Sequence, residues 1–200
     1  KRSELSSEAG KAIMASILGE LYHSYAINNM HRFGNRTEVR EEEQGISALS
    51  KMSLEQIQSK SLTWYRTSLE YKDNITIKDY TAILYPKQKT QSILLEAKTV
   101  RQFVLFRAIK HFSNSQAFVS LPTDAYKMTD SDLFGPLLDF VDIAIETKDR
   151  DNHNYISLKL FQEALSIDAL DENTRQLIDI KRVEYLKNFS EVNDKEKSYI

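Results

Sequence analysis

The sequence predicts an all-α protein, either an antiparallel helical bundle or an array of helical hairpins, with about six helices. Glycine and proline are scarce, with five Gly and three Pro in 200 residues, so the chain has few helix breakers and few tight turns. Apolar residues recur at three- and four-residue spacing along several long segments, which is the period of one helix face. Residue types that cap helix N-termini precede these segments.

The first helix is expected from Ser7 to about Phe33. Ser7 is a suitable N-cap, Glu8 lies in the first turn, and Gly34-Asn35 would end the helix. Apolar side chains at helical spacing predict the inner face. The residues of this predicted inner face are Met14, Ile17, Leu18, Leu21, Tyr22 and Tyr25.

The second long helix is expected from Leu54 to Tyr71. The spacing of Ser53 and Gln56 is that of a capping box, which satisfies two backbone N–H groups at a helix start. Its predicted inner face consists of Leu54, Ile57, Leu62, Tyr65 and Leu69. A polar connection that includes Glu41-Glu42-Glu43 joins the first two helices.

A short helix and a long third helix follow. Thr76 and Asp79 have capping-box spacing before a short helix expected over Ile77–Leu84, which Pro86 closes. The third long helix is expected from Thr90 to Phe112. Its predicted stripe is Ile93, Ala97, Val100, Val104 and Ala108, flanked by Leu105, Ile109 and Phe112. Because this apolar face is broad, we expect the third helix to be central.

The helical pattern is lost over residues 113–132, where Ala117–Leu121 is a candidate extended segment before Pro122. A chain of 200 residues fits one domain or two small ones. We therefore expect residues 1–200 to form a single helical domain, with a possible subdivision near 113–132. Because the sequence starts at Lys1 rather than at a methionine, we also expect the domain to be a fragment of a larger chain.

Three more helices complete the prediction. One starts near Pro136, a favourable first helical position, and runs to about Thr147. The next is capped by Ser157 and runs to about Ile167. The last covers roughly Asp171 to Phe189, with Leu177, Ile180, Val183 and Leu186 on its predicted inner face. The segment Phe161–Asp168 also resembles the second helix of a tetratricopeptide repeat, which leaves open a repeat-like, peptide-binding module.

Composition and motifs exclude several function classes. The chain has no cysteine, which removes disulfides, thiol nucleophiles and cysteine-ligated metals. The formal net charge of −2 is not the excess of positive charge that is typical of nucleic-acid-binding proteins. No apolar run is long enough to span a membrane, and no Walker A loop, Gly-x-Ser-x-Gly elbow or dinucleotide fingerprint is present. We therefore predict a protein that is not an enzyme and has no cofactor.

One segment has a partial ion-binding pattern. Residues 149–160 align with a calcium loop that has oxygen ligands at its odd-numbered positions. The candidate positions are Asp149, Asp151, His153 and Tyr155. Asn154 stands where that loop has its glycine, and Leu160 stands where it has its bidentate glutamate. A polar loop between helices is therefore the first interpretation, and a degenerate calcium site is the alternative.

Three stretches, read together, resemble one protein family. They are Leu18–Tyr25 with Asn28-Asn29, Arg32-Phe33 and Asn35–Glu38; Leu105–Phe112; and Tyr155 with Leu158–Glu163. Their order and spacing resemble the N-terminal helical region of the very large alpha-2-macroglobulin-like envelope proteins of Bacteroidetes, over about Ile13 to Ile200. The core candidates in these stretches are Tyr22, Tyr25, Phe33, Phe106, Phe112, Leu160 and Phe161.

The resemblance implies a parent protein in the periplasm or cell envelope, anchored through a lipoprotein N-terminus that this chain does not contain. That family is thought to inhibit proteases by trapping them, in many members through a Cys-x-Glu-Gln thioester. With no cysteine, this chain cannot contain the thioester. The predicted function is accordingly a non-catalytic scaffold or docking module. The expected partners are the remainder of its own longer chain and, beyond it, a protease or an envelope protein. The alternative is a standalone helical binding module.

Overall fold

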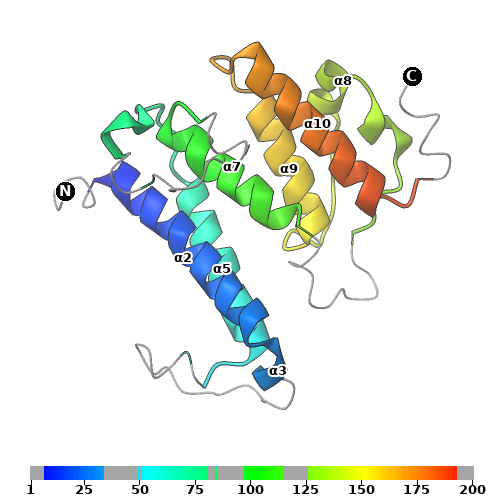
Figure 1. The fold of residues 1–200 in the computed structure, drawn as a ribbon. Coiled ribbons are helices and arrows are strands. Elements are labelled where there is room, and N and C mark those ends of the chain that lie inside the picture. The colour runs from blue at the N-terminus through cyan, green and yellow to red at the C-terminus, as the bar shows by residue number, and fades with distance from the viewer. Residues whose placement is uncertain are drawn as a thin grey trace. The chain divides into compact units, whose positions relative to one another are not determined.

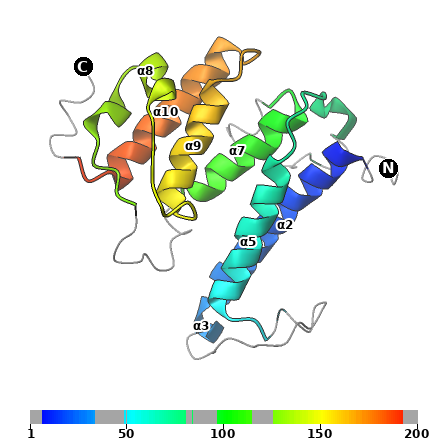
Figure 2. The same ribbon diagram turned by 180° about the vertical axis from the view of Figure 1, so that it is seen from behind.

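A computed structural model describes residues 7–33, 51–80, 97–114 and 126–192, together with residues 49 and 84 (Figures 1 and 2). Over these residues the chain forms six α-helices of six residues or longer, and it forms no strand there. The all-α prediction is confirmed. The predicted helix end at Gly34-Asn35 and the extended candidate Ala117–Leu121 lie outside the described residues.

Contacts divide the chain into two compact units. Unit 1 comprises Lys1–Tyr85 with Thr99–Val104, and unit 2 comprises Pro86–Lys98 with Leu105–Ile200. The chain passes from one unit to the other within helix α7, Val100–Phe112. The expected subdivision near 113–132 falls partly on residues 115–125, outside the described part, and the single-domain expectation stays a prediction.

Unit 1 is built on a hairpin of two antiparallel helices, α2 (Glu8–Asn28) and α5 (Leu54–Leu69), which lie side by side in Figures 1 and 2. The predicted N-cap of α2 is confirmed, because the Ser7 hydroxyl accepts a hydrogen bond from the Gly10 N–H at 3.1 Å. The capping box of α5 is also confirmed, with both of its hydrogen bonds between Ser53 and Gln56. A short α3 (Met30–Phe33) follows α2.

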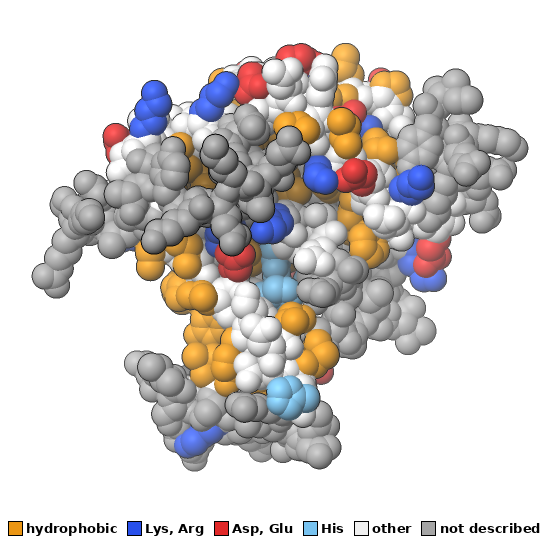
Figure 3. Space-filling model, in the orientation of Figure 1, with side chains coloured by type: hydrophobic (Ala, Val, Ile, Leu, Met, Phe, Trp, Pro, Cys, Tyr) orange, Lys and Arg blue, Asp and Glu red, His pale blue; other side chains and the backbone are white. Residues whose placement is uncertain are grey.

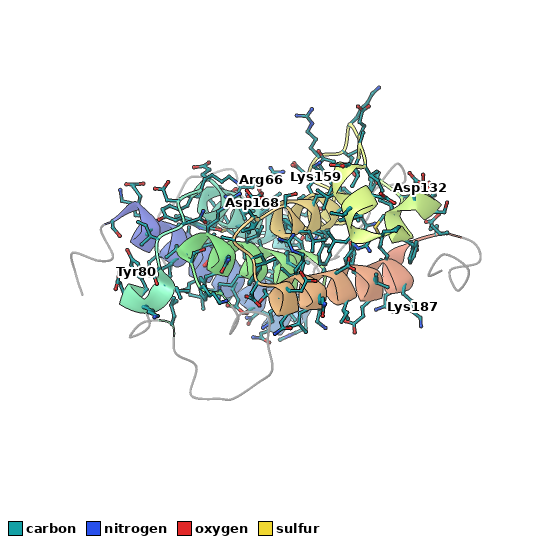
Figure 4. The ribbon with its side chains drawn as sticks, turned by 90° about the horizontal axis from the view of Figure 1, so that it is seen from above. Arg66, Tyr80, Asp132, Lys159, Asp168 and Lys187 are labelled. Carbon is teal, nitrogen blue, oxygen red and sulfur yellow. The ribbon has the colours of Figure 1, made fainter. Side chains whose placement is uncertain are left out.

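The segment after α5 differs from the prediction. Ile77–Tyr80 forms one 3₁₀ turn, η1, Leu84 at the predicted helix end is helical, and residues 81–83 and 85–96 lie outside the description. The Tyr80 hydroxyl is 2.8 Å from the Ser7 hydroxyl, which ties η1 to the start of α2; Tyr80 is labelled in Figure 4. Thr76 bonds the Lys78 N–H rather than that of Asp79, so the predicted capping box is replaced by a tighter turn.

Small residues form the contact between α2 and α5. A Cβ on Gly19 would lie 2.7 Å from the Tyr65 ring, far inside van der Waals contact, so only glycine leaves room for this ring. The Ser61 hydroxyl donates a hydrogen bond to the Gly19 carbonyl oxygen at 2.8 Å across the interface. Helix axes approach more closely when the side chains between them are small. The buried residues of α2 are Ala9, Gly10, Ala12, Ile13, Ala15, Ser16, Gly19 and Ala26.

The predicted inner face of α2 is therefore wrong over most of its length. Met14 and Leu21 are 37% and 59% exposed, and Ile17 and Leu18 are half-buried. Ile13 near the start of the helix is fully buried, and at the far end Tyr22 and Tyr25 lie against a cluster of Ala26, Phe33 and Ile57. The prediction placed the most hydrophobic side chains inside. In the structure, α2 packs on α5 through its small residues, which let the two helix axes come close together.

Helix α7 is shorter than predicted. Residues 97–99 are not helical, and residues 90–96 lie outside the description. The Val100 N–H donates to the Ile75 carbonyl oxygen at 2.9 Å, and Thr76 and Thr99 form an antiparallel bridge. Thr99 and Gln102 then form a capping box that starts the helix, and their spacing in the sequence is the signal for this start. The predicted apolar face beyond this point is confirmed, since Val100, Val104, Leu105, Ala108, Ile109 and Phe112 are all buried.

Unit 2 contains the 3₁₀ turn η4 (Ser131–Phe134) and helices α8 (Leu137–Asp142), α9 (His153–Leu165) and α10 (Glu172–Phe189). Helices α9 and α10 form a second hairpin, and α8 packs against α9. Helix α8 ends five residues before the predicted Thr147. The amide of Gln162 donates to the Phe140 and Ile143 carbonyl oxygens, both at 2.9 Å, and so holds the chain that leaves α8.

The start of α9 also differs from the prediction. The Asn152 side chain, not that of Ser157, caps the helix by accepting from the Asn154 and Tyr155 N–H groups at 2.8 and 3.4 Å. Ser157 is buried inside the helix. Both residues are favourable N-caps, so local preference alone did not distinguish them. The core candidates in this helix, Leu160 and Phe161, are buried as predicted.

A buried arginine organises unit 2. Arg182 on α10 is 2% exposed, and its guanidinium lies 4.5 Å from the centre of the Phe140 ring. It donates to the Asp179 carboxylate at 2.8 Å and to the carbonyl oxygens of Leu133 and Gly135 at 2.7 and 3.0 Å. One planar side chain therefore joins α10, η4 and the start of α8 through directed hydrogen bonds.

Arg182 explains why the predicted inner face of α10 is partly wrong. Leu177 and Ile180 are exposed, whereas Leu186 is buried as predicted and Val183 is half-buried. With Arg182 facing inward, α10 is rotated about its axis away from the orientation that would bury Leu177 and Ile180. The buried residues of α10 are Thr174, Ile178, Arg182, Tyr185 and Leu186. The bounds of α10 agree with the prediction to within one residue, and Asp171, the first residue of the predicted helix, is its N-cap.

The first prediction concerns Gly19. Replacing glycine by alanine within a helix is favourable by about 1 kcal/mol when space allows. Here Gly19→Ala forces the new Cβ against the buried Tyr65 ring, and we expect a net loss of about 1–2 kcal/mol, because overpacking a filled contact outweighs the gain in helix propensity. Urea unfolding measures the change. Lys60→Ala on the exposed face of α5 is the control, and a stabilised Gly19→Ala variant would contradict the close contact.

The second prediction concerns Arg182. We expect Arg182→Met to lower the free energy of unfolding by about 3 kcal/mol or more, because it leaves the Leu133 and Gly135 carbonyl oxygens without their donor. Arg182→Lys should restore little, since an ammonium cannot reproduce the planar fork. Lys181→Met, next to it in an exposed ion pair with Glu184, is the control and should change stability by about 0.5 kcal/mol at most. Equal effects at both positions would argue against the buried role.

The third prediction concerns the N-cap of α10. The Lys98 ammonium, 2.9 Å from the Asp171 carboxylate, and the N–H and hydroxyl groups of Thr174 lower the pKa of Asp171 to about 2. A lowered carboxyl pKa stabilises the fold above the unfolded value near 4, and this contribution is lost as the pH falls towards 2. We expect Asp171→Asn, which keeps a cap but removes the charge, to melt at a lower temperature than wild type at pH 7. The gap between the two melting temperatures should narrow from pH 7 to pH 2, and a gap that stays constant over this range would contradict this assignment.

Candidate functional site

The outward face of α2 is the surface feature that the packing of unit 1 leaves open. We call Met14, Ile17, Leu18 and Leu21 the open stripe; their spacing of three, four and seven residues places them on one side of the helix. Met14 and Leu21 are exposed, and Ile17 and Leu18 are half-buried. Hydrophobic side chains gather along the hairpin of α2 and α5 in Figure 3. The stripe is continuous along almost two helical turns.

The open stripe and the packed face lie on different sides of α2. At about 100° per residue, Gly19 in the packed face is turned roughly 140° from Met14. Charged residues are few along these 21 residues, and Glu8 and Lys11 already pair with each other at 2.7 Å. An apolar stripe on one side only is normal for a helix at a protein surface. Helix α2 instead has two apolar sides, and α5 covers one of them.

His23 and Glu20 on α2 have the spacing of a metal-binding helix. Burial lowers the pKa of His23 below its ordinary value, and the nearby Glu20 carboxylate partly opposes this shift. The imidazole is therefore mostly neutral at pH 7. Within the described ranges, no three His, Asp or Glu side chains are grouped so that they could hold a metal ion. The structure thus offers no second ligand pair there to complete the motif.

The candidate calcium loop is organised as a helix cap. The Asp149 carboxylate accepts a hydrogen bond from the Asn152 side-chain amide at 3.1 Å, and Asn152 in turn caps α9. Asp151 is exposed, and His153 is already the first residue of the helix. The His153 ring lies edge-on to Phe112 at 5.1 Å, and the Tyr155 ring lies against Tyr126 at 6.2 Å. Since calcium needs several converging oxygen ligands, this geometry does not favour a site, and the calcium hypothesis stays a prediction.

A buried tyrosine lies beside this cap. The Tyr185 hydroxyl donates a hydrogen bond to the Asn154 side-chain oxygen at 2.7 Å. Burial raises the pKa of Tyr185 far above its ordinary value, the adjacent Ser157 hydroxyl opposes the shift, and the Tyr126 phenol adds to it. A phenol held neutral in this way is a fixed hydrogen-bond donor between α10 and α9. Sequence reasoning missed this link, because no local pattern distinguishes an inward tyrosine with a polar partner.

Several titratable side chains elsewhere in unit 2 are exposed on the surface. Figure 4 labels four of them, and all four are exposed and lie apart from one another. They are Asp132, Lys159, Asp168 and Lys187. They come from η4, from α9, from the connection after α9 and from α10. These four residues form no charged cluster with one another.

Comparisons with known proteins return no relative: no protein-family model, no curated protein and no solved structure matches the chain. The resemblance to alpha-2-macroglobulin-like proteins therefore rests on the three sequence stretches and stays a prediction. Among the helices that the structure describes, none is both long and apolar enough to cross a membrane.

The fourth prediction tests the calcium loop. We expect millimolar calcium to leave the melting temperature unchanged, because the Asp149 carboxylate already serves the cap of α9 and His153 packs against Phe112. A ligand that binds the native state must raise the melting temperature. Thermal melts with and without calcium, and with magnesium as the control, make the test. A rise with calcium that disappears in Asp149→Asn would revive the ion-site hypothesis.

Proposed function

We propose that the chain is a non-catalytic helical scaffold and docking module, and that the open stripe on α2 is the surface through which it meets a protein partner. The observation that carries this proposal is the two-sided apolar character of α2. Its small-residue side is filled by α5, and on its large-residue side Met14 and Leu21 are exposed. A helix that is apolar on two sides belongs between two layers rather than at a surface.

The energetics of burial favour a partner for this stripe. Covering a large aliphatic side chain completely stabilises a protein or complex by about 1.5–3 kcal/mol. Leu21 keeps more than half of its surface in water, and Met14 keeps more than a third. Isolated exposed apolar residues are ordinary, whereas an aligned stripe on an otherwise packed helix is typical of an interaction surface.

The partner that we propose is the remainder of a longer chain. This follows the resemblance to the N-terminal helical region of alpha-2-macroglobulin-like envelope proteins, in which this helical region precedes many β-sandwich domains. A neighbouring domain that covers the open stripe would give the module its role as a spacer and docking platform. On this proposal the parent protein is located in the periplasm or cell envelope, and contact with a protease or an envelope protein is made by the assembled parent.

The parent protein is tested directly by the complete reading frame on both sides of Lys1 and Ile200. A lipoprotein leader upstream, with macroglobulin-type sandwich domains downstream, would support the proposed parent and compartment. A methionine just before Lys1 with a stop codon just after Ile200 would overturn it. The standalone binding module would then become the leading hypothesis.

The fifth prediction tests the open stripe in the protein made from that complete reading frame. A photo-crosslinking amino acid at position 21 should link to another domain of the same chain, because the proposed partner covers Leu21. The matched control is position 138, where Leu138 on α8 is 77% exposed and belongs to no stripe. We expect cross-links from position 21 and none from position 138. The absence of cross-links at position 21, or equal yields at both positions, would contradict docking through α2.

A second readout separates loss of docking from loss of folding. Leu21→Gln and Leu138→Gln should each change the stability of the isolated chain by about 0.5 kcal/mol at most, since both side chains are exposed. In the complete protein, Leu21→Gln should increase amide hydrogen exchange along α2, and Leu138→Gln should not. Equal exchange in the two variants would argue that nothing covers the stripe.

A further inference from the structure

We draw no further inference here: the strongest candidate beyond the open stripe, the exposed apolar pair Leu177 and Ile180 on α10, is an unpartnered helix face, and nothing in the structure shows what covers it.

Discussion

The contact between Gly19 and the Tyr65 ring is the constraint on which the arrangement of unit 1 depends. A Cβ on Gly19 would lie 2.7 Å from the ring, and the Ser61 hydroxyl donates a hydrogen bond to the Gly19 carbonyl oxygen. Together they fix both the separation of α2 and α5 and the rotation of α2 about its axis. Once that rotation is set, Ile13 is buried while Met14 and Leu21 stay exposed, and the open stripe is its direct consequence.

Unit 2 shows the same principle with a polar residue. The Arg182 guanidinium is buried against Phe140 and bonds two carbonyl oxygens that the turn between η4 and α8 would otherwise leave without a partner. Satisfying those acceptors outweighs the burial of two more aliphatic side chains, so Leu177 and Ile180 face water. In both units, the face that packs is the one whose shape and hydrogen bonds fit the neighbour, not the most apolar one.

The polar groups of the described residues act mainly as caps and cross-links. Asn152 and Asp171 cap helices, Gln162 holds the exit of α8, and Tyr185 stays neutral as a donor to Asn154. Each of these groups is engaged in the fold rather than aimed at a ligand. These bonds hold the helices of each hairpin together, and on the proposed function α2 contributes the face that meets another protein. This division of roles is why we favour docking over chemistry.

The sequence by itself determined the helices and their ends where local signals act alone: the cap at Ser7, the capping box at Ser53, and α10 from its cap at Asp171. These features depend on hydrogen bonds within a few residues and on a period of 3.6, both of which can be read along the chain. Tertiary structure decided which face each helix buries and how the capped start of α7 pairs with the segment before η1. Those choices depend on groups distant in sequence, such as Ile75 opposite Val100 and Leu133 beside Arg182. No periodicity reports such pairings, because they are set by the shape and unsatisfied hydrogen bonds of the neighbouring element.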